Sequence, residues 1–496
     1  MTYFNFGAYN IVMRIHFIGS HGASIKRLMQ ISEFLGYSVT GSDARSKEGH
    51  RAENVEGADL VVYSAAVKRV NVELIAAKAL GIRMLERSEF LGELSAEFKS
   101  VIAVSGTHGK TSASSMIAEI FSGRDTCVHI GGECGHIQQD GKEFFVTEAC
   151  EYKQSFLTLK PELAVILNMD LDHTDCYSNI GEYRASFKQF AAKAKKVLIN
   201  GDDPYCFEWA ALVGYLTFGL DVKNDYYASN ITYSKQGVAF DFCYRGDILG
   251  KVQVDAVGEH SVLNALSAAA SAHIAGLSLE EIISGLRQYR GVRRRFEFLD
   301  AKSCADVYSD YAHHPTEIRA SISAARSIGY KKIIVAFEPH TFTRTQSLYK
   351  DFARSLLLAD EIYVMPIYAA REVEIDGVKS NMIVDVAKKF RDKIDLVLGV
   401  NPFEDGLLAG EKGVKKLASV FEYMCGYDCL FRVLDGRLIE CCIEGDKCDV
   451  DSGMFGSEVL GDVASSVDNS EKEVAVIFMG AGTVDDKGRE YVGIAK

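Results

Sequence analysis

The segment 106–111 carries the strongest chemical signal in the sequence: it reads Gly-Thr-His-Gly-Lys-Thr and directly follows the apolar run 101–104. Backbone N–H groups in such a loop converge on phosphate oxygens, and the helix that follows adds the positive end of its dipole. The spacing predicts that Lys110 contacts the β- and γ-phosphates of a nucleotide and that the Thr111 hydroxyl binds Mg²⁺. A full P-loop has another glycine where this chain has Val104, so the motif is the shorter G-x-x-G-K-T form.

Acidic and imidazole side chains follow two further apolar runs, where α/β proteins place their ligands. Glu148 comes at the end of the run 144–147, and His173 lies beyond the run 163–167. Mg²⁺ prefers hard oxygen ligands, so Glu148 is predicted to bind it, whereas Glu151 is less well placed. Taken alone, His173 is more often a hydrogen-bonded turn residue than a metal ligand.

A second glycine turn follows the apolar run 14–18. It keeps only two glycines of a dinucleotide fingerprint, with His21 and Ser24 where glycines would stand. The turn indicates some phosphate at a helix start, and a turn without any ligand is an equally good interpretation. Ser42 and Asp43 end the next strand, where an acidic side chain commonly meets a sugar or a base.

Two segments in the last third of the chain gather imidazole and guanidinium groups at strand ends. Residues 310–317 join a predicted strand to a helix and include His313, and residues 338–344 follow the next strand and include His340 and Arg344. Such a group suits a small carboxylate ligand, because Arg binds carboxylates through two parallel hydrogen bonds. A polar loop network without a ligand is the alternative.

Apolar runs alternate with helical patterns through most of the chain, which is typical of α/β units with parallel sheets. With about 150 residues per domain, 496 residues predict about three domains. Polar stretches and an arginine run put their expected boundaries at 1–99, 100–297 and 298–496. Residues near 410–470 alternate poorly and contain many cysteines, so we expect an irregular insertion there.

The composition excludes several classes of protein. Hydrophobic residues make up 48% and charged residues 25%, which excludes a disordered or collagen-like chain. The net charge of -13 argues against a general partner among nucleic acids or anionic membranes, since both attract positive charge. No signal peptide and no apolar run of about 18 residues is visible, and the 12 cysteines suit reduced thiols, so we expect a cytoplasmic protein. The cysteines between 425 and 448 lack the paired spacing of a zinc site.

Taken together and in this order, these segments resemble the Mur ligase family. The resemblance extends from Arg14 to Gly482, and the segments 294–297 and 310–315 are the most specific to the alanine-adding branch of the family. The segments that carry it are 15–19, 41–43, 106–111, 148–152, 172–175, 260–265, 291–297, 310–315 and 478–482.

The resemblance implies a three-domain α/β fold: an N-terminal Rossmann-like domain for a UDP-sugar, a central P-loop ATPase with a mostly parallel sheet, and a C-terminal Rossmann-like domain. It implies a cytoplasmic step of peptidoglycan precursor synthesis, in which ATP and Mg²⁺ convert the carboxylate of UDP-N-acetylmuramate to an acyl phosphate that L-alanine attacks. The partners are then small molecules, with no nucleic acid and no membrane, and the chain is a monomer or weak homodimer. The alternatives are a ligase of the same family for another amino acid or peptide, and a non-catalytic ATP-binding relative.

Roles for single residues follow from the same motifs. The implied catalytic residues are Lys110, Glu148, His173, Arg295, His313, His340 and Arg344. The implied nucleotide contacts are Gly106, Thr107, His108, Gly109, Lys110, Thr111, Asn264, Arg295 and Asp310, and the implied metal ligands are Thr111, Glu148 and His173. The UDP-sugar is expected at Gly19, Ser20, His21, Gly22, Ser42, Asp43 and Ser64. The family's N-terminal turn is richer in glycine and ends in methionine, so His21, Ser24 and Ile25 are expected to crowd a pyrophosphate there.

Overall fold

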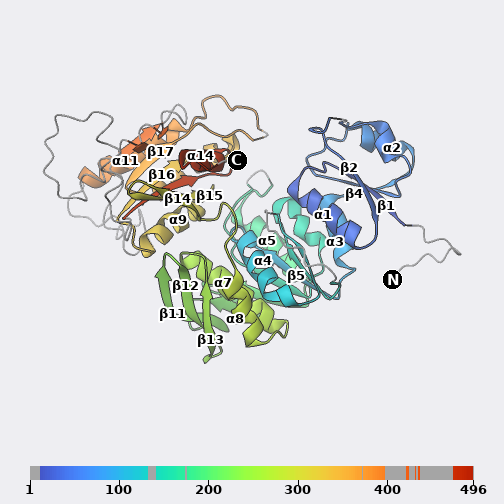
Figure 1. The fold of residues 1–496 in the computed structure, drawn as a ribbon, viewed down its shortest axis with the longest axis horizontal. Coiled ribbons are helices and arrows are strands. Elements are labelled where there is room, and N and C mark those ends of the chain that lie inside the picture. Colours follow the sequence, from blue (N-terminus) through green and yellow to red (C-terminus); the bar gives the residue numbers. More distant parts are fainter. Residues whose placement is uncertain are drawn as a thin grey trace. The chain divides into compact units, whose positions relative to one another are not determined.

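A computed structural model of the chain divides into two compact units, each described here by itself (Figure 1). Unit 1 comprises Met1–Ile231, Ala239–Val254 and Val262–Val292, and unit 2 comprises Thr232–Val238, Asp255–Ser261 and Arg293–Lys496. The structure describes residues 12–47, 49–131, 141–173, 176–370, 372–396, 420–423, 430–431, 434–435 and 473–494.

Unit 1 begins with a four-stranded parallel sheet of order β2-β1-β3-β4. Both Phe17 and Ile18 on its central strand are buried, as expected for a parallel strand covered on both faces. The strands are β1 (Arg14–Ile18), β2 (Ser38–Ser42), β3 (Leu60–Tyr63) and β4 (Arg83–Glu86). The helices around them, blue in Figure 1, are α1 (Ala23–Phe34), η1 (Ala52–Val55), α2 (Val72–Ala79) and α3 (Arg87–Ser95).

The second sheet of unit 1 has nine strands in the order β13-β12-β11-β10-β9-β8-β5-β7-β6. All neighbouring pairs from β6 to β11 in this order are parallel, namely β6–β7, β7–β5, β5–β8, β8–β9, β9–β10 and β10–β11. The strands are β5 (Ser100–Ser105), β6 (Thr126–His129), β7 (Phe144–Glu148), β8 (Leu163–Ile166), β9 (Lys196–Asn200), β10 (Leu216–Gly219), β11 (Tyr226–Ser234), β12 (Gly237–Tyr244) and β13 (Asp247–Val254). The helices are α4 (Lys110–Ile120), η2 (Phe121–Gly123), η3 (Tyr152–Thr158), α5 (Ile180–Ala191), α6 (Pro204–Val213), α7 (Glu259–Ile274) and α8 (Leu279–Gln288).

The two sheets of unit 1 share one hydrophobic core. Phe90 and Phe98 from the first part belong to the same buried cluster as Phe145 and Phe156 from the second. The rings of Phe98 and Phe145 stack with their centroids 4.6 Å apart. The first and second parts of the chain therefore stabilise each other through buried apolar surface.

Unit 2 contains a six-stranded sheet of order β14-β15-β19-β16-β17-β18, in which only the edge pair β14–β15 is antiparallel among the described strands. Its strands are β14 (Glu297–Lys302), β15 (Ala305–Asp310), β16 (Lys332–Phe337), β17 (Glu361–Val364), β18 (Val420–Tyr423) and β19 (Val474–Met479). Its helices are α9 (Pro315–Ser327), α10 (Phe342–Leu356), α11 (Asn381–Leu396) and α14 (Val484–Tyr491). The predicted α/β fold with three mostly parallel sheets is confirmed.

Most of the insertion expected near 410–470 lies outside the described residues, as do all five cysteines of its dense set. The described part of it includes β18, which pairs in parallel with β17 and so is not irregular. The described cysteines are free thiols, namely Cys127, Cys150, Cys176, Cys206, Cys243 and Cys304. Within the part of the chain that the structure covers, no helix is long and apolar enough to cross a membrane.

Candidate active site

The phosphate loop connects β5 to α4 and needs its two glycines. Gly106 and Gly109 both have positive φ, 144° and 85°, a conformation that other residues rarely adopt. A Cβ on Gly109 would lie 2.5 Å from Oδ1 of Asn264, a residue on α7. Asn264, expected from the resemblance to contact nucleotide, therefore lies directly against the loop.

Asn168, which follows β8, fixes the loop from the other side. The His108 backbone N–H donates to Asn168 Oδ1 (2.8 Å), and Asn168 Nδ2 donates back to the His108 carbonyl (3.0 Å). The Thr107 hydroxyl donates to the carbonyl of Asp170 (2.7 Å). These bonds hold the loop backbone in place, a role of Asn168 that the sequence does not predict.

Lys110, the first residue of α4, forms a buried ion pair with Glu151. Its Nζ lies 3.0 and 2.9 Å from the two carboxylate oxygens of Glu151, which is 1% exposed, and it also donates to the carbonyl of Thr107 (3.1 Å). Burial by itself lowers the pKa of Lys110, but the Glu151 carboxylate outweighs this, and the pKa lies above its usual value. Burial likewise raises the pKa of Glu151, but Lys110 and His173 bring it below the usual range.

Glu151 has a larger role in this site than the sequence indicates. The pattern favours Glu148 over Glu151, yet Glu151 forms the ion pair with the lysine of the loop. It lies three residues beyond the end of β7, where a strand-end ligand is less expected. The sequence does contain a signal for Glu151: a second acidic residue stands three positions after Glu148, still close to the end of the buried strand.

The residues predicted to bind Mg²⁺ follow β5, β7 and β8 at the same edge of the sheet. Among the described residues, Oε1 of Glu148 is buried and has no hydrogen-bond partner. An unpartnered buried carboxylate oxygen is costly unless a cation or water satisfies it, so this atom fits a metal ligand. Thr111 in the first turn of α4 adds a hydroxyl. His173 Nε2 lies 3.5 Å from Glu151 Oε1, and its ring packs on Tyr152. This set of hard oxygens and one imidazole fits Mg²⁺.

The N-terminal turn is built around a different carboxylate. The backbone N–H groups of Gly19 and Ser20 both donate to the carbonyl of Ser42, at 2.8 and 2.9 Å. The Ser42 hydroxyl donates to Glu73 Oε2 (2.6 Å), and Asn54 Nδ2 donates to Glu73 Oε1 (2.5 Å).

Glu73 itself lies at the start of α2 and is fully buried. His50 Nδ1 lies 2.9 Å from Oε2 of Glu73, and His16 Nε2 lies 3.8 Å from Oε1. Burial would raise the pKa of Glu73, but the nearby His16 imidazole and hydrogen bonds from Ser42, Asn54 and His50 lower it to about 2. Nothing in the local sequence distinguishes Glu73 from an ordinary acidic residue at a helix start, so it is not predicted.

Asp43, expected to meet the sugar nucleotide, is engaged within the protein. Arg45 Nε donates to Asp43 Oδ1 (3.0 Å), and the His21 backbone N–H donates to Oδ2 (3.1 Å). The hydrogen bond from Arg45 is the main reason that the pKa of Asp43 lies well below its usual range. Ser64 lies beside Gly19, 3.4 Å from the position that a Cβ would take there.

The three residues expected to crowd a pyrophosphate have different environments. Ile25 is buried in the shared core, and the Ser24 hydroxyl lies 3.0 Å from Nε2 of His129. Only His21 among the three is exposed. Any crowding of a ligand at this turn therefore rests on His21.

In unit 2, His340 lies two residues before α10, and Arg344 lies in its first turn. Arg344 Nη1 donates to His340 Nδ1 (3.3 Å), the ring centroids of His340 and His313 are 5.9 Å apart, and Tyr368 stacks on His340. Burial, followed by the charges of His313 and Arg344, lowers the pKa of His340 to about 4. His340 is therefore neutral at pH 7 and can accept the Arg344 hydrogen bond.

Arg295 and Asp310 belong to the same end of this sheet. Arg295 lies over the ring of Tyr311, 5.0 Å from its centroid, and Nη1 is 3.7 Å from Glu317 Oε1. Asp310 is buried, which raises its pKa to about 6 although the Ser321 hydroxyl donates to it. The structure thus brings Arg295, Asp310, His313, His340 and Arg344 into unit 2, with Tyr311 and Glu317 as unpredicted neighbours.

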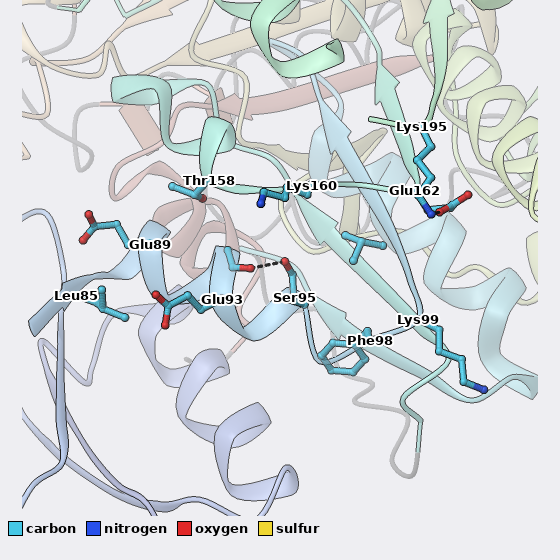
Figure 2. A pocket seen from close by; sticks show the side chains of 13 residues that line it. Leu85, Glu89, Glu93, Ser95, Phe98, Lys99, Thr158, Lys160, Glu162 and Lys195 are labelled. Atoms are coloured by element: carbon cyan, nitrogen blue, oxygen red, sulfur yellow. Dashed lines mark hydrogen bonds and ion pairs between the residues drawn. The ribbon is translucent and has the colours of Figure 1, made fainter. Parts of the chain in front are cut away.

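Unit 1 also contains a cavity of about 550 Å³ beside α3 (Figure 2). Phe98 and Lys99 precede β5, Glu162 precedes β8, and Lys195 precedes β9, so the cavity lies at the amino ends of these strands. The phosphate loop follows the carboxyl end of β5. Figure 2 shows Lys195 directed toward Glu162, and Nζ lies 2.7 Å from its carboxylate. The cavity is therefore separate from the chemistry of the phosphate loop.

Three family models match the chain: "Mur ligase family, catalytic domain" over residues 14–99, "Mur ligase middle domain" over 104–272, and "Mur ligase, glutamate ligase domain" over 294–404. The UDP-N-acetylmuramate–L-alanine ligase of Caldanaerobacter subterraneus subsp. tengcongensis is 40% identical over 402 residues, covering 76% of this chain and 87% of that protein. The enzyme of the same name from Clostridium perfringens is 36% identical over 405 residues, covering 76% and 88%.

Among solved structures, the UDP-N-acetylmuramate–alanine ligase of Thermotoga maritima matches with a TM-score of 0.68. It is 24% identical, and the match covers 97% of this chain and 98% of that one. A murein peptide ligase from Psychrobacter arcticus matches with a TM-score of 0.58 at 21% identity. At these identities the two structures establish a common fold.

Proposed function

The chain belongs to the Mur ligase family, and from that premise we propose that it joins L-alanine to the carboxylate of UDP-N-acetylmuramate at the expense of ATP, a step of peptidoglycan precursor synthesis. The observation that carries the reaction type is the phosphate loop, with the Lys110–Glu151 ion pair and the unpartnered oxygen of Glu148 beside it. The choice of substrates rests on the names of relatives up to 40% identical.

The proposed reaction has two steps. An oxygen of the muramyl carboxylate attacks the γ-phosphorus, the bond to the bridging oxygen breaks, and ADP leaves. The amine of L-alanine then bonds to the acyl carbon, inorganic phosphate leaves, and the amine loses its proton. A carboxylate resists amines because its oxygen is a poor leaving group, and phosphorylation replaces it with a better one.

The residues of unit 1 serve the first step. The N–H groups of the loop 106–111 hold the phosphates, and Lys110 neutralises the charge that builds up as one anion attacks another. Thr111, Glu148 and His173 would hold Mg²⁺, which supplies further positive charge at the phosphate oxygens when it is bound.

The residues of unit 2 serve the second step. Arg344 would bind the carboxylate of L-alanine, with His313 and His340 beside it, and Arg295 and Asp310 are the nucleotide contacts of this unit. The corresponding division assigns residues 1–99 to the UDP-sugar, 100–297 to ATP and 298–496 to the amino acid. The proposal includes a cytoplasmic location, because ATP is a cytoplasmic substrate, and a monomer or weak homodimer.

Phosphate release from ATP tests the proposal, measured with and without UDP-N-acetylmuramate and with and without L-alanine. Release is expected only when both are present, and chelation of Mg²⁺ is expected to stop it. Release that does not need L-alanine would contradict the proposal. A preference for an amino acid bulkier than alanine, glycine or serine would instead indicate another ligase of the family.

A further inference from the structure

A chain of side-chain hydrogen bonds runs from the N-terminal turn to the strand of the predicted metal site. Arg87 Nη1 donates to Ser24 Oγ (3.2 Å), and Ser24 Oγ lies 3.0 Å from His129 Nε2. His129 Nδ1 lies 3.1 Å from Thr147 Oγ1, and the Thr147 hydroxyl donates to the carbonyl of Glu148 (3.1 Å). All five residues belong to unit 1.

The donors in this chain have one consistent order. The Thr147 hydroxyl uses its only proton on the Glu148 carbonyl, so its oxygen must accept a proton from Nδ1 of His129. A neutral imidazole with its proton on Nδ1 accepts at Nε2, so the Ser24 hydroxyl donates there. Arg87 can only donate, and it completes the chain at the Ser24 oxygen.

The environment of His129 maintains this order. The side chain is 3% exposed, and burial, followed by the charges of Arg87 and Arg27, lowers its pKa to about 3. It therefore keeps one donor and one acceptor at physiological pH, as the chain requires. His129 and Thr147 are also direct neighbours in the pairing of β6 with β7.

The two ends of the chain are the places that the reaction must align. Ser24 lies in the first turn of α1, directly after the turn 19–22, and Glu148 carries the unpartnered oxygen at the end of β7. The muramyl carboxylate and the γ-phosphate must meet in near-attack geometry, and a misplacement of about 1 Å costs on the order of 10² in rate.

We propose that Ser24, His129 and Thr147 are positioning residues that hold the turn before α1 in register with Glu148. This inference rests on the function proposed above, since it assigns the two ends to the sugar nucleotide and to the metal. None of the three needs to touch a reacting atom, and each acts through the next.

Steady-state kinetics of Ser24→Ala, Thr147→Val and the double variant test whether these residues position the turn before α1 relative to Glu148. Each single change is expected to lower kcat about tenfold, part of the loss that a 1 Å misplacement causes, with KM for ATP within about twofold of wild type. The double variant should lose no more than the worse single one, because a chain broken once is already broken. Ser24→Thr keeps the hydroxyl and is expected to recover kcat.

Ser32→Ala is the matched control, because Ser32 lies on the same helix and its hydroxyl donates only to the Leu28 carbonyl, 2.8 Å away. Its kcat should stay at the wild-type value. The proposal is overturned if Ser24→Ala behaves like Ser32→Ala, if the two losses multiply to about a hundredfold, or if Ser24→Thr stays as slow as Ser24→Ala.

Amide hydrogen exchange separates this inference from the proposed function, because it needs no turnover. Both Ser24→Ala and Thr147→Val are expected to speed amide exchange at the first turn of α1 and at the end of β7. Ser32→Ala is expected to leave the exchange rates of both segments unchanged. If the wild type does not ligate L-alanine but each variant speeds exchange at both segments, the proposed function is wrong and the positioning role of the three residues is supported. If each variant speeds exchange only in its own helix or strand, the positioning role is wrong, whatever the enzymatic activity.

Discussion

Two glycine turns, each between a strand and a helix, have a buried carboxylate behind them, and the two carboxylates have different partners. Behind the loop 106–109, Glu151 faces the ammonium of Lys110. Behind the turn 19–22, Glu73 faces a hydroxyl, an amide and two imidazoles. The first arrangement places a full positive charge at the helix start, and the second holds the backbone without one. The difference shows why the segment 106–111 is the stronger sequence signal for a bound phosphate: it includes a lysine, and the turn 19–22 does not.

The largest effect is expected from removing that positive charge. Lys110→Ala should lower kcat by about 10²–10³, as for loss of one group that stabilises the transition state, or abolish turnover. Lys99→Ala is the control, because Lys99 is exposed and precedes the opposite end of β5. Initial rates of alanine-dependent phosphate release measure both, and a Lys110→Ala enzyme with more than a tenth of wild-type kcat would remove the contrast between the turns.

Removing the carboxylate behind the loop should cost stability. Glu151→Ala leaves the Lys110 ammonium buried without its partner, and breaking such a pair costs about 3–5 kcal/mol. Urea denaturation of the wild type and the variant gives the difference in the free energy of unfolding. A loss below about 1 kcal/mol would mean that the ion pair does not fasten the loop.

The carboxylate behind the N-terminal turn is expected to contribute less and to do so in a pH-dependent way. Glu73→Ala leaves the donors of Ser42 and Asn54 unsatisfied, at a cost of about 1–3 kcal/mol. The pKa of Glu73 is about 2 in the folded chain, below its value of about 4.5 in the unfolded chain, so its contribution is complete above about pH 4.5 and falls as the pH drops toward 2.

The measurement is the free energy of unfolding of wild type and Glu73→Ala between pH 7 and pH 3. The gap between them should be widest at neutral pH and should narrow below about pH 4.5. A gap that widens on acidification would reverse the assigned direction of the pKa shift.

The smallest effects are expected from adding a single methyl group to one glycine of each turn. Gly109→Ala places a Cβ at positive φ and 2.5 Å from Asn264 Oδ1, which should cost about 1–3 kcal/mol and weaken ATP binding. Gly22→Ala meets only the Gly19 carbonyl, 3.3 Å away, and should cost about 0.5 kcal/mol as a poorer N-cap. Thermal unfolding and ATP titration of the pair check the order, and equal losses would contradict it.

Local patterns predicted much of this molecule. The alternation of apolar runs and helical segments predicted α/β units with parallel sheets, because central strands such as β1 and β5 are buried along most of their length. The phosphate loop was found in the same way, since its glycines and Lys110 stand within six residues. His340 and Arg344 were also found, because both closely follow the apolar run 332–337.

Contacts between distant parts of the chain escaped prediction. Glu151 pairs with Lys110 across 41 positions, and Ser24 reaches His129 across 105. A lone histidine at the end of an apolar strand looks like a core residue, and an acid at a helix start looks like an ordinary cap. His129 gains Thr147 through the pairing of β6 with β7, and Glu73 gains Ser42 where the end of β2 meets the start of α2.

The discontinuity of unit 1 has a consequence for biosynthesis. Its last segment, Val262–Val292, returns to the sheet after the chain has already contributed to unit 2, and it carries the Asn264 that lies against Gly109. A nascent chain on the ribosome therefore makes its phosphate loop long before it makes the helix that closes it. Because domains generally fold as units during synthesis, the proposed ATP site is completed only once more than half of the polypeptide has been translated.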